Sequence, residues 1–120
     1  MSVLRAHGEL AWAVVISNAV AGTWALAAHW VEPLRHRALW WFTTVAQLTI
    51  FAQAILGTVM IASQGREIDD FHTFYGFASI AAVGIIYSYR QQVYEWRYLL
   101  YGFGGLFLMG MAIRTMTLGA

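Results

Sequence analysis

Residues 39–62 decide the fold: they run LWWFTTVAQLTIFAQAILGTVMIA and contain no charged side chain. A helix needs about 20 consecutive apolar residues to cross the hydrocarbon layer of a membrane, which is roughly 30 Å thick. Three further apolar segments, 10–28, 71–89 and 98–118, are of similar length. Because a bilayer offers the backbone no hydrogen-bond partners, such segments are helical there. The sequence therefore predicts four membrane-spanning helices.

The composition leaves little of the chain for anything outside these segments. Of 120 residues, 60% are hydrophobic and only 11% are charged, a balance that water-soluble domains do not show. Short loops force consecutive helices to run antiparallel. We therefore expect an all-α, integral-membrane, up-down-up-down four-helix bundle, with residues 1–120 forming one transmembrane domain. The first segment is too long for a signal-peptide core, so we expect it to be retained.

Charge and cysteine usage exclude several classes of function. The net charge is +1, and the seven basic residues, all arginine, form no run that would neutralise a phosphate backbone. Nucleic acid is therefore excluded as a partner. The chain has no cysteine, which excludes an iron–sulfur cluster and a thiolate nucleophile. Histidine, carboxylate, hydroxyl and amide groups remain for chemistry.

Arginines differ in number between the two ends of the predicted bundle. The end with the first and third loops carries Arg35, Arg37, Arg90 and Arg97. The opposite end carries Arg5, Arg66 and Arg114. Basic residues in short loops tend to stay in the cytoplasm. This count predicts a multi-pass cell-membrane protein with both termini outside.

Two histidines open the first and third segments, which run in the same direction. His7 and His72 should therefore lie at the same depth near the same surface. Helices one and three are diagonal in a four-helix bundle, roughly 12–14 Å apart, and two inward imidazoles leave the space that a metalloporphyrin needs. The inner-face residues that follow are mostly small: Gly76, Ser79 and Val83 after His72, and Ala11, Val14, Asn18 and Gly22 after His7.

This pattern suggests a b-type haem with His7 and His72 as axial metal ligands and Gly76 beside the macrocycle. Six-coordinate iron favours electron transfer over oxygen chemistry. Three arginines are available at that end to bind the haem carboxylates: Arg5, Arg66 and Arg114. Two simpler interpretations stay open. His7 and His72 can be ordinary interfacial residues, since imidazoles are common at membrane interfaces, and Arg114 can extend its side chain to the headgroups instead of binding a carboxylate.

The run QAILGTV at 53–59, followed by a short loop and a histidine-bearing helix, resembles the heme A synthase family. There, a leucine-rich segment ending in Gln-x-x-x-Gly precedes such a helix. The Arg5-Ala6-His7 opening also resembles the start of one four-helix half of that family. The resemblance implies a haem-binding transmembrane bundle with His7 and His72 as axial ligands.

The chain departs from the family in two respects. The family has a Glu-x-x-His-Arg pattern around this histidine. Here Leu4 stands at the glutamate position and Gly8 at the arginine position. The chain also supplies only one half, so a second haem position would need a homodimer. The family's oxidase activity is therefore not implied, and whether the protein is an enzyme stays open.

Two other functions compete with haem binding. A cofactor-free accessory subunit would pack its apolar faces and the glycine-rich segment 102–105 onto a larger membrane complex. A quinone carbonyl hydrogen-bonded to Gln53 is the weaker alternative. Buried amides such as Asn18 and Gln53 more often form interhelical hydrogen bonds.

Overall fold

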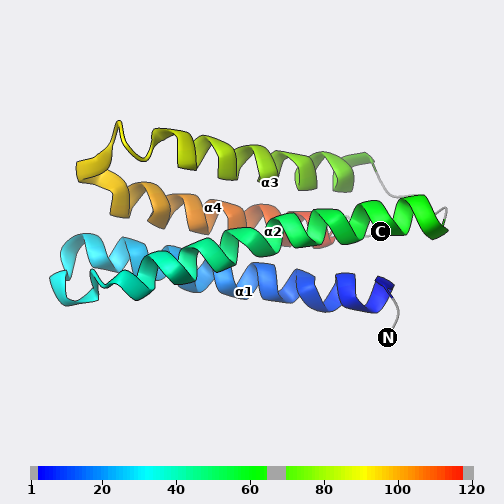
Figure 1. Cartoon of the computed structure of the whole chain (residues 1–120), viewed down its shortest axis with the longest axis horizontal. Helices are drawn as coiled ribbons and strands as arrows, with labels where there is room; N and C mark the ends of the chain where they lie inside the picture. The colour runs from blue at the N-terminus through cyan, green and yellow to red at the C-terminus, as the bar shows by residue number, and fades with distance from the viewer. Residues whose placement is uncertain (1–2, 65–69, 118–120) are drawn as a thin grey trace.

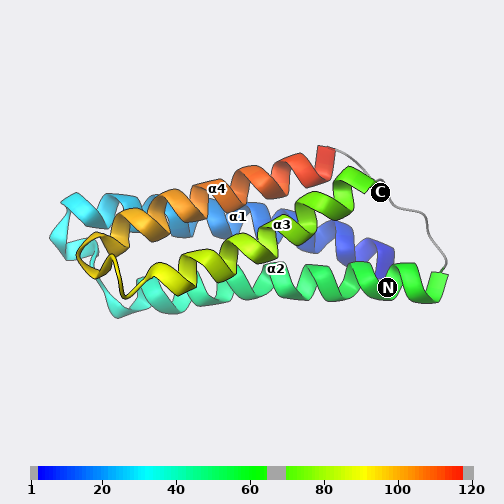
Figure 2. The ribbon, with the colours of Figure 1, turned by 90° about the horizontal axis from the view of Figure 1, so that it is seen from above.

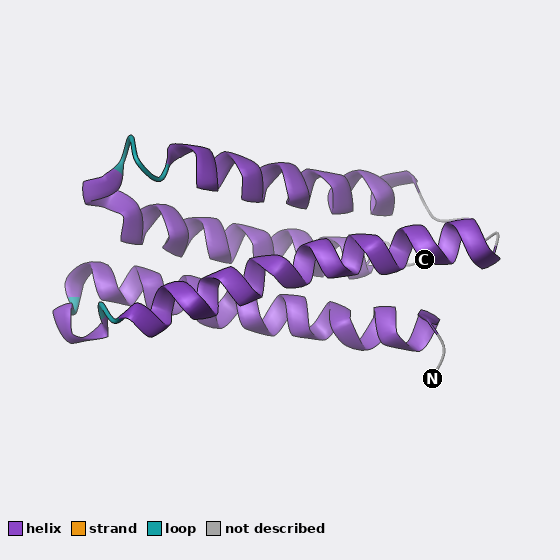
Figure 3. Ribbon diagram, viewed as in Figure 1, coloured by secondary structure: helices purple, strands orange, loops and turns teal. Residues whose placement is uncertain are grey.

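The computed structural model of the chain describes residues 3–64 and 70–117. In these two stretches the backbone forms four long helices and no strand: α1 (Val3–Trp30), α2 (Arg37–Gln64), α3 (Asp70–Tyr89) and α4 (Arg97–Thr117). One-turn 3₁₀ helices, η1 (Glu32–Leu34) and η2 (Tyr94–Trp96), occupy the first and third connections (Figure 3). The all-α prediction is confirmed.

The helices run alternately up and down and lie roughly side by side (Figures 1 and 2). α1 packs most extensively against α4 and then against α2, whereas α3 packs mainly against α4. The contact between α2 and α3 is the sparsest among the four neighbouring pairs. α1 and α3 are diagonal, as expected. The N-terminus of α1 and the C-terminus of α4 lie at the same end.

The first helix begins earlier than the hydropathy pattern predicts, at Val3 rather than at residue 10. Arg5 Nε donates to Glu9 Oε1 at 3.2 Å, an i,i+4 pair that supports the added turns. His7 consequently lies in the second turn of α1, while His72 lies in the first turn of α3. At the other end of α1, Arg35 donates to the carbonyls of Ala28 and His29 at 2.7 and 2.6 Å. These bonds satisfy carbonyls that a helix end leaves unpaired.

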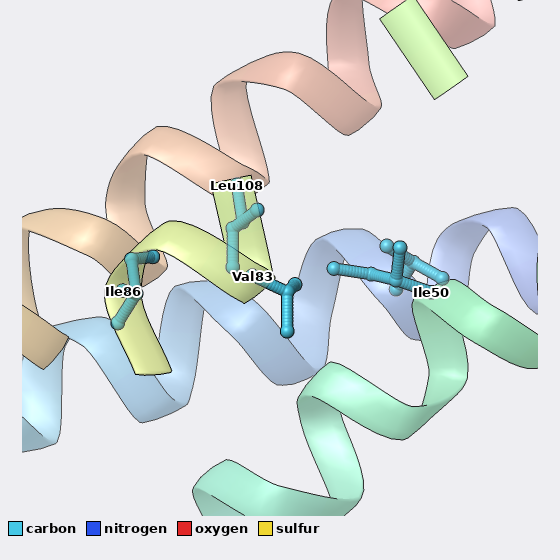
Figure 4. Close-up of a cluster of buried hydrophobic side chains, with 5 residues drawn as sticks. Ile50, Val83, Ile86 and Leu108 are labelled. Carbon is cyan, nitrogen blue, oxygen red and sulfur yellow. The ribbon is translucent and has the colours of Figure 1, made fainter. Parts of the chain in front are cut away.

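Side chains from all four helices meet in a small core near the middle of the bundle. This cluster consists of Val14, Ile50, Val83, Ile86 and Leu108. Four of them are labelled in Figure 4. Asn18 ties α1 to α2 beside this core, because its Nδ2 donates to the carbonyl of Ala46 at 3.2 Å. The interhelical bond expected for this amide is confirmed.

Glycines allow α1 and α4 to approach each other closely. A Cβ on Gly22 would lie 2.7 Å from the backbone N of Leu106, and a Cβ on Gly105 would lie 2.7 Å from Gly22 Cα. A Cβ on Gly102 would lie 2.8 Å from the backbone N of Leu26. Real Cβ atoms do not approach backbone atoms so closely, so only glycine fits at these three positions. Gly102 and Gly105 of the glycine-rich segment 102–105 therefore pack against α1 of the same chain.

The outer surface of the bundle is strongly apolar. Large hydrophobic side chains are exposed on every helix, among them Trp12, Val45, Phe77 and Phe103. Among the described residues, four helical segments are long and apolar enough to cross a membrane: Arg5–Trp30, Arg37–Ala62, Phe71–Tyr89 and Tyr94–Thr117. The molecule is 48 Å long, close to the roughly 40–45 Å thickness of a bilayer with its headgroups.

Candidate functional site

The structure brings His7 and His72 together across the diagonal of the bundle. Their ring centroids are 6.3 Å apart and their planes are inclined by 45°. Each imidazole is part of a helix that begins at the same end of the molecule, and both rings are directed inward at similar depth. The pair lies at the end of the bundle where α1 begins and α4 ends, the right-hand end of the bundle in Figure 1.

The spacing of the two rings is too long for a direct hydrogen bond. Ring nitrogens lie about 1.1 Å from the ring centre, so with centroids 6.3 Å apart they approach no closer than about 4 Å, beyond hydrogen-bond distance. If each ring directed a nitrogen at the other, this lower limit would equal two imidazole–metal bonds, each about 2.0–2.1 Å for zinc. The centroid spacing is therefore compatible with two ligands of one metal ion.

His72 is oriented by a backbone group of α4. Its Nδ1 lies 2.8 Å from the carbonyl oxygen of Thr115. A carbonyl only accepts, so His72 Nδ1 carries the proton and Nε2 carries the lone pair. A metal-ligating histidine almost always donates its second ring N–H in this way. In the neutral ring this is the Nδ1–H tautomer, whose Nε2 is the nitrogen that can act as a metal ligand.

His7 is held by α2. Gln53 Nε2 donates to the His7 carbonyl at 2.8 Å, and a Cβ on Gly57, one turn later, would lie 3.5 Å from His7 Cε1. Two buried polar atoms beside this contact, His7 Nδ1 and Gln53 Oε1, have no hydrogen-bond partner among the described residues. Buried polar atoms are normally paired. The interhelical role expected for Gln53 is confirmed.

A cavity of about 560 Å³ surrounds the histidine pair. All four helices line it, and Val14, Ile50 and Leu108 of the central core close its inner end. Gly76 lines the wall on α3, and a Cβ added there would meet no atom within 4 Å. The cavity is therefore lined by few polar groups and is open beside His72.

The small-residue surfaces predicted below each histidine are shorter than expected. On α3 the cavity lining includes Gly76 and Ser79, but Val83 packs into the core. On α1 it includes Ala11 and Val14. Asn18 and Gly22 lie outside the lining because they contact α2 and α4, respectively.

The cavity reaches the outer surface of the bundle. Six of its lining residues are exposed: Gly8 and Trp12 on α1, Thr58 and Ile61 on α2, and Thr73 and Phe77 on α3. Of the neighbouring helices, α2 and α3 have the sparsest mutual contact. The side of the site therefore opens toward the apolar outer surface.

Two of the three arginines predicted as partners of haem carboxylates, Arg5 and Arg114, lie near the site but not in it. Arg5 is exposed and pairs with Glu9. Arg114 is exposed in the last turn of α4, with its Cζ 6.0 Å from the centre of the Tyr75 ring. Neither lines the cavity. Arg66 lies outside the described residues.

The other histidines lie at the opposite end of the bundle. The His29 ring stacks on Trp96 with centroids 5.8 Å apart, and His36 Nδ1 accepts from the Ala38 backbone N–H at 3.0 Å. They are therefore remote from the pair.

One feature of the site has no sequence signal at all. The Thr115 group that orients His72 is a backbone carbonyl, which every residue type carries.

Across residues 3–64 and 70–117, no three or more histidine, cysteine, aspartate or glutamate side chains gather as a metal-binding group. Compared with known proteins, the chain matches no family model, no curated protein and no solved structure.

Proposed function

We propose that this chain is a small integral-membrane b-type haem protein, with His7 and His72 as the axial ligands, that acts in electron transfer or as a haem-binding subunit. The observation that carries the proposal is the 6.3 Å spacing of the two rings inside a cavity at the bundle's end. The resemblance of segment 53–59 and of the His7 region to one heme A synthase half supports the same cofactor.

The bilayer is the environment that suits the outer surface. Trp12, Phe77 and Phe103 are all more than half exposed, which is favourable against lipid and costly against water. The long axis also matches the bilayer thickness. We therefore place the bundle across the cell membrane, with α1 to α4 as its four spans.

The residues around the cavity suit a haem. The volume of about 560 Å³ falls within the range of about 300–1,000 Å³ that ligand sites occupy. His7 and His72 would supply the two axial nitrogens, and Gly76 leaves space for the macrocycle. When bound, a haem with two axial histidines supplies one-electron redox chemistry.

A visible spectrum tests the proposal. We expect the protein, expressed with ample haem and purified in mild detergent, to show a sharp α band in its reduced-minus-oxidised spectrum. His7→Ala and His72→Ala should each abolish that band. His36→Asn is the matched control, because it keeps a side chain that can accept from Ala38 at the far end of the bundle. A colourless wild-type protein, or a His72→Ala variant with an unchanged spectrum, would refute haem ligation by this pair.

A further inference from the structure

Gln53 contacts His7 from the neighbouring helix. Its Nε2 donates to the His7 carbonyl at 2.8 Å, and the side chain lines the cavity. The same amide group carries an acceptor, Gln53 Oε1. That oxygen is buried and has no partner within the described part of the chain.

The two histidines differ in how their Nδ1 atoms are paired. His72 Nδ1 donates to the Thr115 carbonyl, whereas His7 Nδ1 is buried and no described residue bonds to it. If His7 binds a metal through Nε2, its Nδ1 carries a proton and needs an acceptor. His7 Nδ1, a donor when Nε2 binds a metal, and Gln53 Oε1, an acceptor, therefore belong to two residues that line the same cavity, and neither atom has a partner among the described residues.

We infer that Gln53 is the positioning residue of His7. Its amide N–H fixes the His7 backbone, and its Oε1 accepts the Nδ1 proton of His7 through one bridging water molecule. This inference rests on the proposed haem function. It gives each ligand one orienting acceptor: the Thr115 carbonyl for His72 and the Gln53 amide for His7.

The inference predicts two measurable effects. Loss of a partner that orients a metal-ligating histidine typically lowers metal affinity by about 10–100-fold. Loss of the acceptor also makes the imidazole a weaker donor, which favours reduced over oxidised iron and raises the reduction potential. A residue that merely joined α1 to α2 would change stability but would not move the potential.

The test compares Gln53→Met, Gln53→Glu and Asn18→Leu in the haem-loaded protein. Methionine keeps the length of the side chain but removes both hydrogen bonds, so we expect haem to dissociate about 10–100-fold faster and the potential to rise. Glutamate keeps an oxygen acceptor but loses the N–H bond to the His7 carbonyl. We therefore expect a dissociation rate between those of the wild type and Gln53→Met, and a potential that does not rise. Asn18→Leu removes the other amide that joins α1 to α2, outside the cavity, and should change neither quantity.

The outcomes separate the inference from the proposed function. A wild-type protein without haem overturns both. If the wild type binds haem but Gln53→Met matches it in dissociation rate and potential, the inference alone fails. It also fails if Gln53→Glu behaves like Gln53→Met, or if Asn18→Leu moves the potential as much as Gln53→Met does.

Discussion

At the scale of single residues, Gly76 sets the width of the site beside His72. A Cβ there would enter open space, and the position lines the cavity one turn after the histidine. We predict that Gly76→Phe fills the cavity and reduces haem retention by at least about tenfold, because the cofactor and the ring cannot share the same volume. Titrating the apoprotein with haem, followed by absorbance, measures the effect.

The matched control for this prediction is Gly84→Phe. Gly84 lies on the same helix, is exposed, and its Cβ would also meet no atom within 4 Å, but it does not line the cavity. Haem retention should therefore be unchanged in Gly84→Phe. Equal losses in the two variants would mean that a phenylalanine disturbs α3 wherever it is placed.

The meeting of His7 and His72 could be predicted from sequence because helix direction fixes depth: two spans that start on the same side carry their first residues at the same level. The hydrogen-bond partners of the two histidines could not be predicted from the sequence. Which ring nitrogen bears the proton depends on the Thr115 carbonyl, and a backbone group leaves no trace in the order of side chains. The sequence also indicated Gln53 as an interhelical amide but not His7 as its partner.

At the scale of helices, the α1–α4 contact depends on the absence of side chains. We predict that Gly22→Ala and Gly105→Ala each destabilise the bundle by about 1–3 kcal/mol, the usual cost of overpacking, because the new Cβ meets backbone atoms that cannot rotate away. Unfolding in mixed detergent micelles gives the free energy.

Gly110→Ala provides the comparison on the same helix. No atom lies within 4 Å of its would-be Cβ. Alanine is favoured over glycine in a helix by roughly 0.5–1 kcal/mol, so this variant should be as stable as the wild type or slightly more stable. If Gly110→Ala is also destabilised, then α4 tolerates no added side chain at any glycine. Close packing against α1 would then not be the cause of the losses in Gly22→Ala and Gly105→Ala.

The four helices were predictable because an apolar run long enough to cross a membrane has few other solutions. The unequal packing of the four helices was not predictable from the sequence. Apolar side chains suit both the core and the lipid around a bundle, so their order along a helix does not distinguish its inner face from its outer face. The sequence therefore did not indicate that α1 contacts α4 most closely or that α2 and α3 make the sparsest contact. Gly22 and Gly105 allow the backbones of α1 and α4 to touch, which explains why this pair is packed most closely.

At the scale of the whole molecule, a cofactor bound between His7 and His72 would join the diagonal helices α1 and α3. A ligand that binds only the folded state stabilises it by about 2.7 kcal/mol when its free concentration is about 100 times its Kd. We therefore predict that haem raises the unfolding temperature of the wild type in detergent but not that of His72→Ala. An equal rise in both would indicate that haem partitions into the micelle or binds elsewhere.

The charges at the two ends of the molecule predict its orientation. The sequence puts four arginines at the end opposite the histidine pair (Arg35, Arg37, Arg90 and Arg97) and three at the other. Arg35, Arg90 and Arg97 each pack the guanidinium over a tyrosine ring, within 4.9 Å of the ring centre. Cations held among aromatic rings suit the headgroup layer, and the basic excess favours the cytoplasmic side. We predict that both termini, and with them the haem site, face outward. Alkaline phosphatase fused after residue 120 should then be active in a bacterial host, and green fluorescent protein at the same position should be dark. The opposite pair of results would place the site on the cytoplasmic face, where its redox partner would have to be a cytoplasmic one.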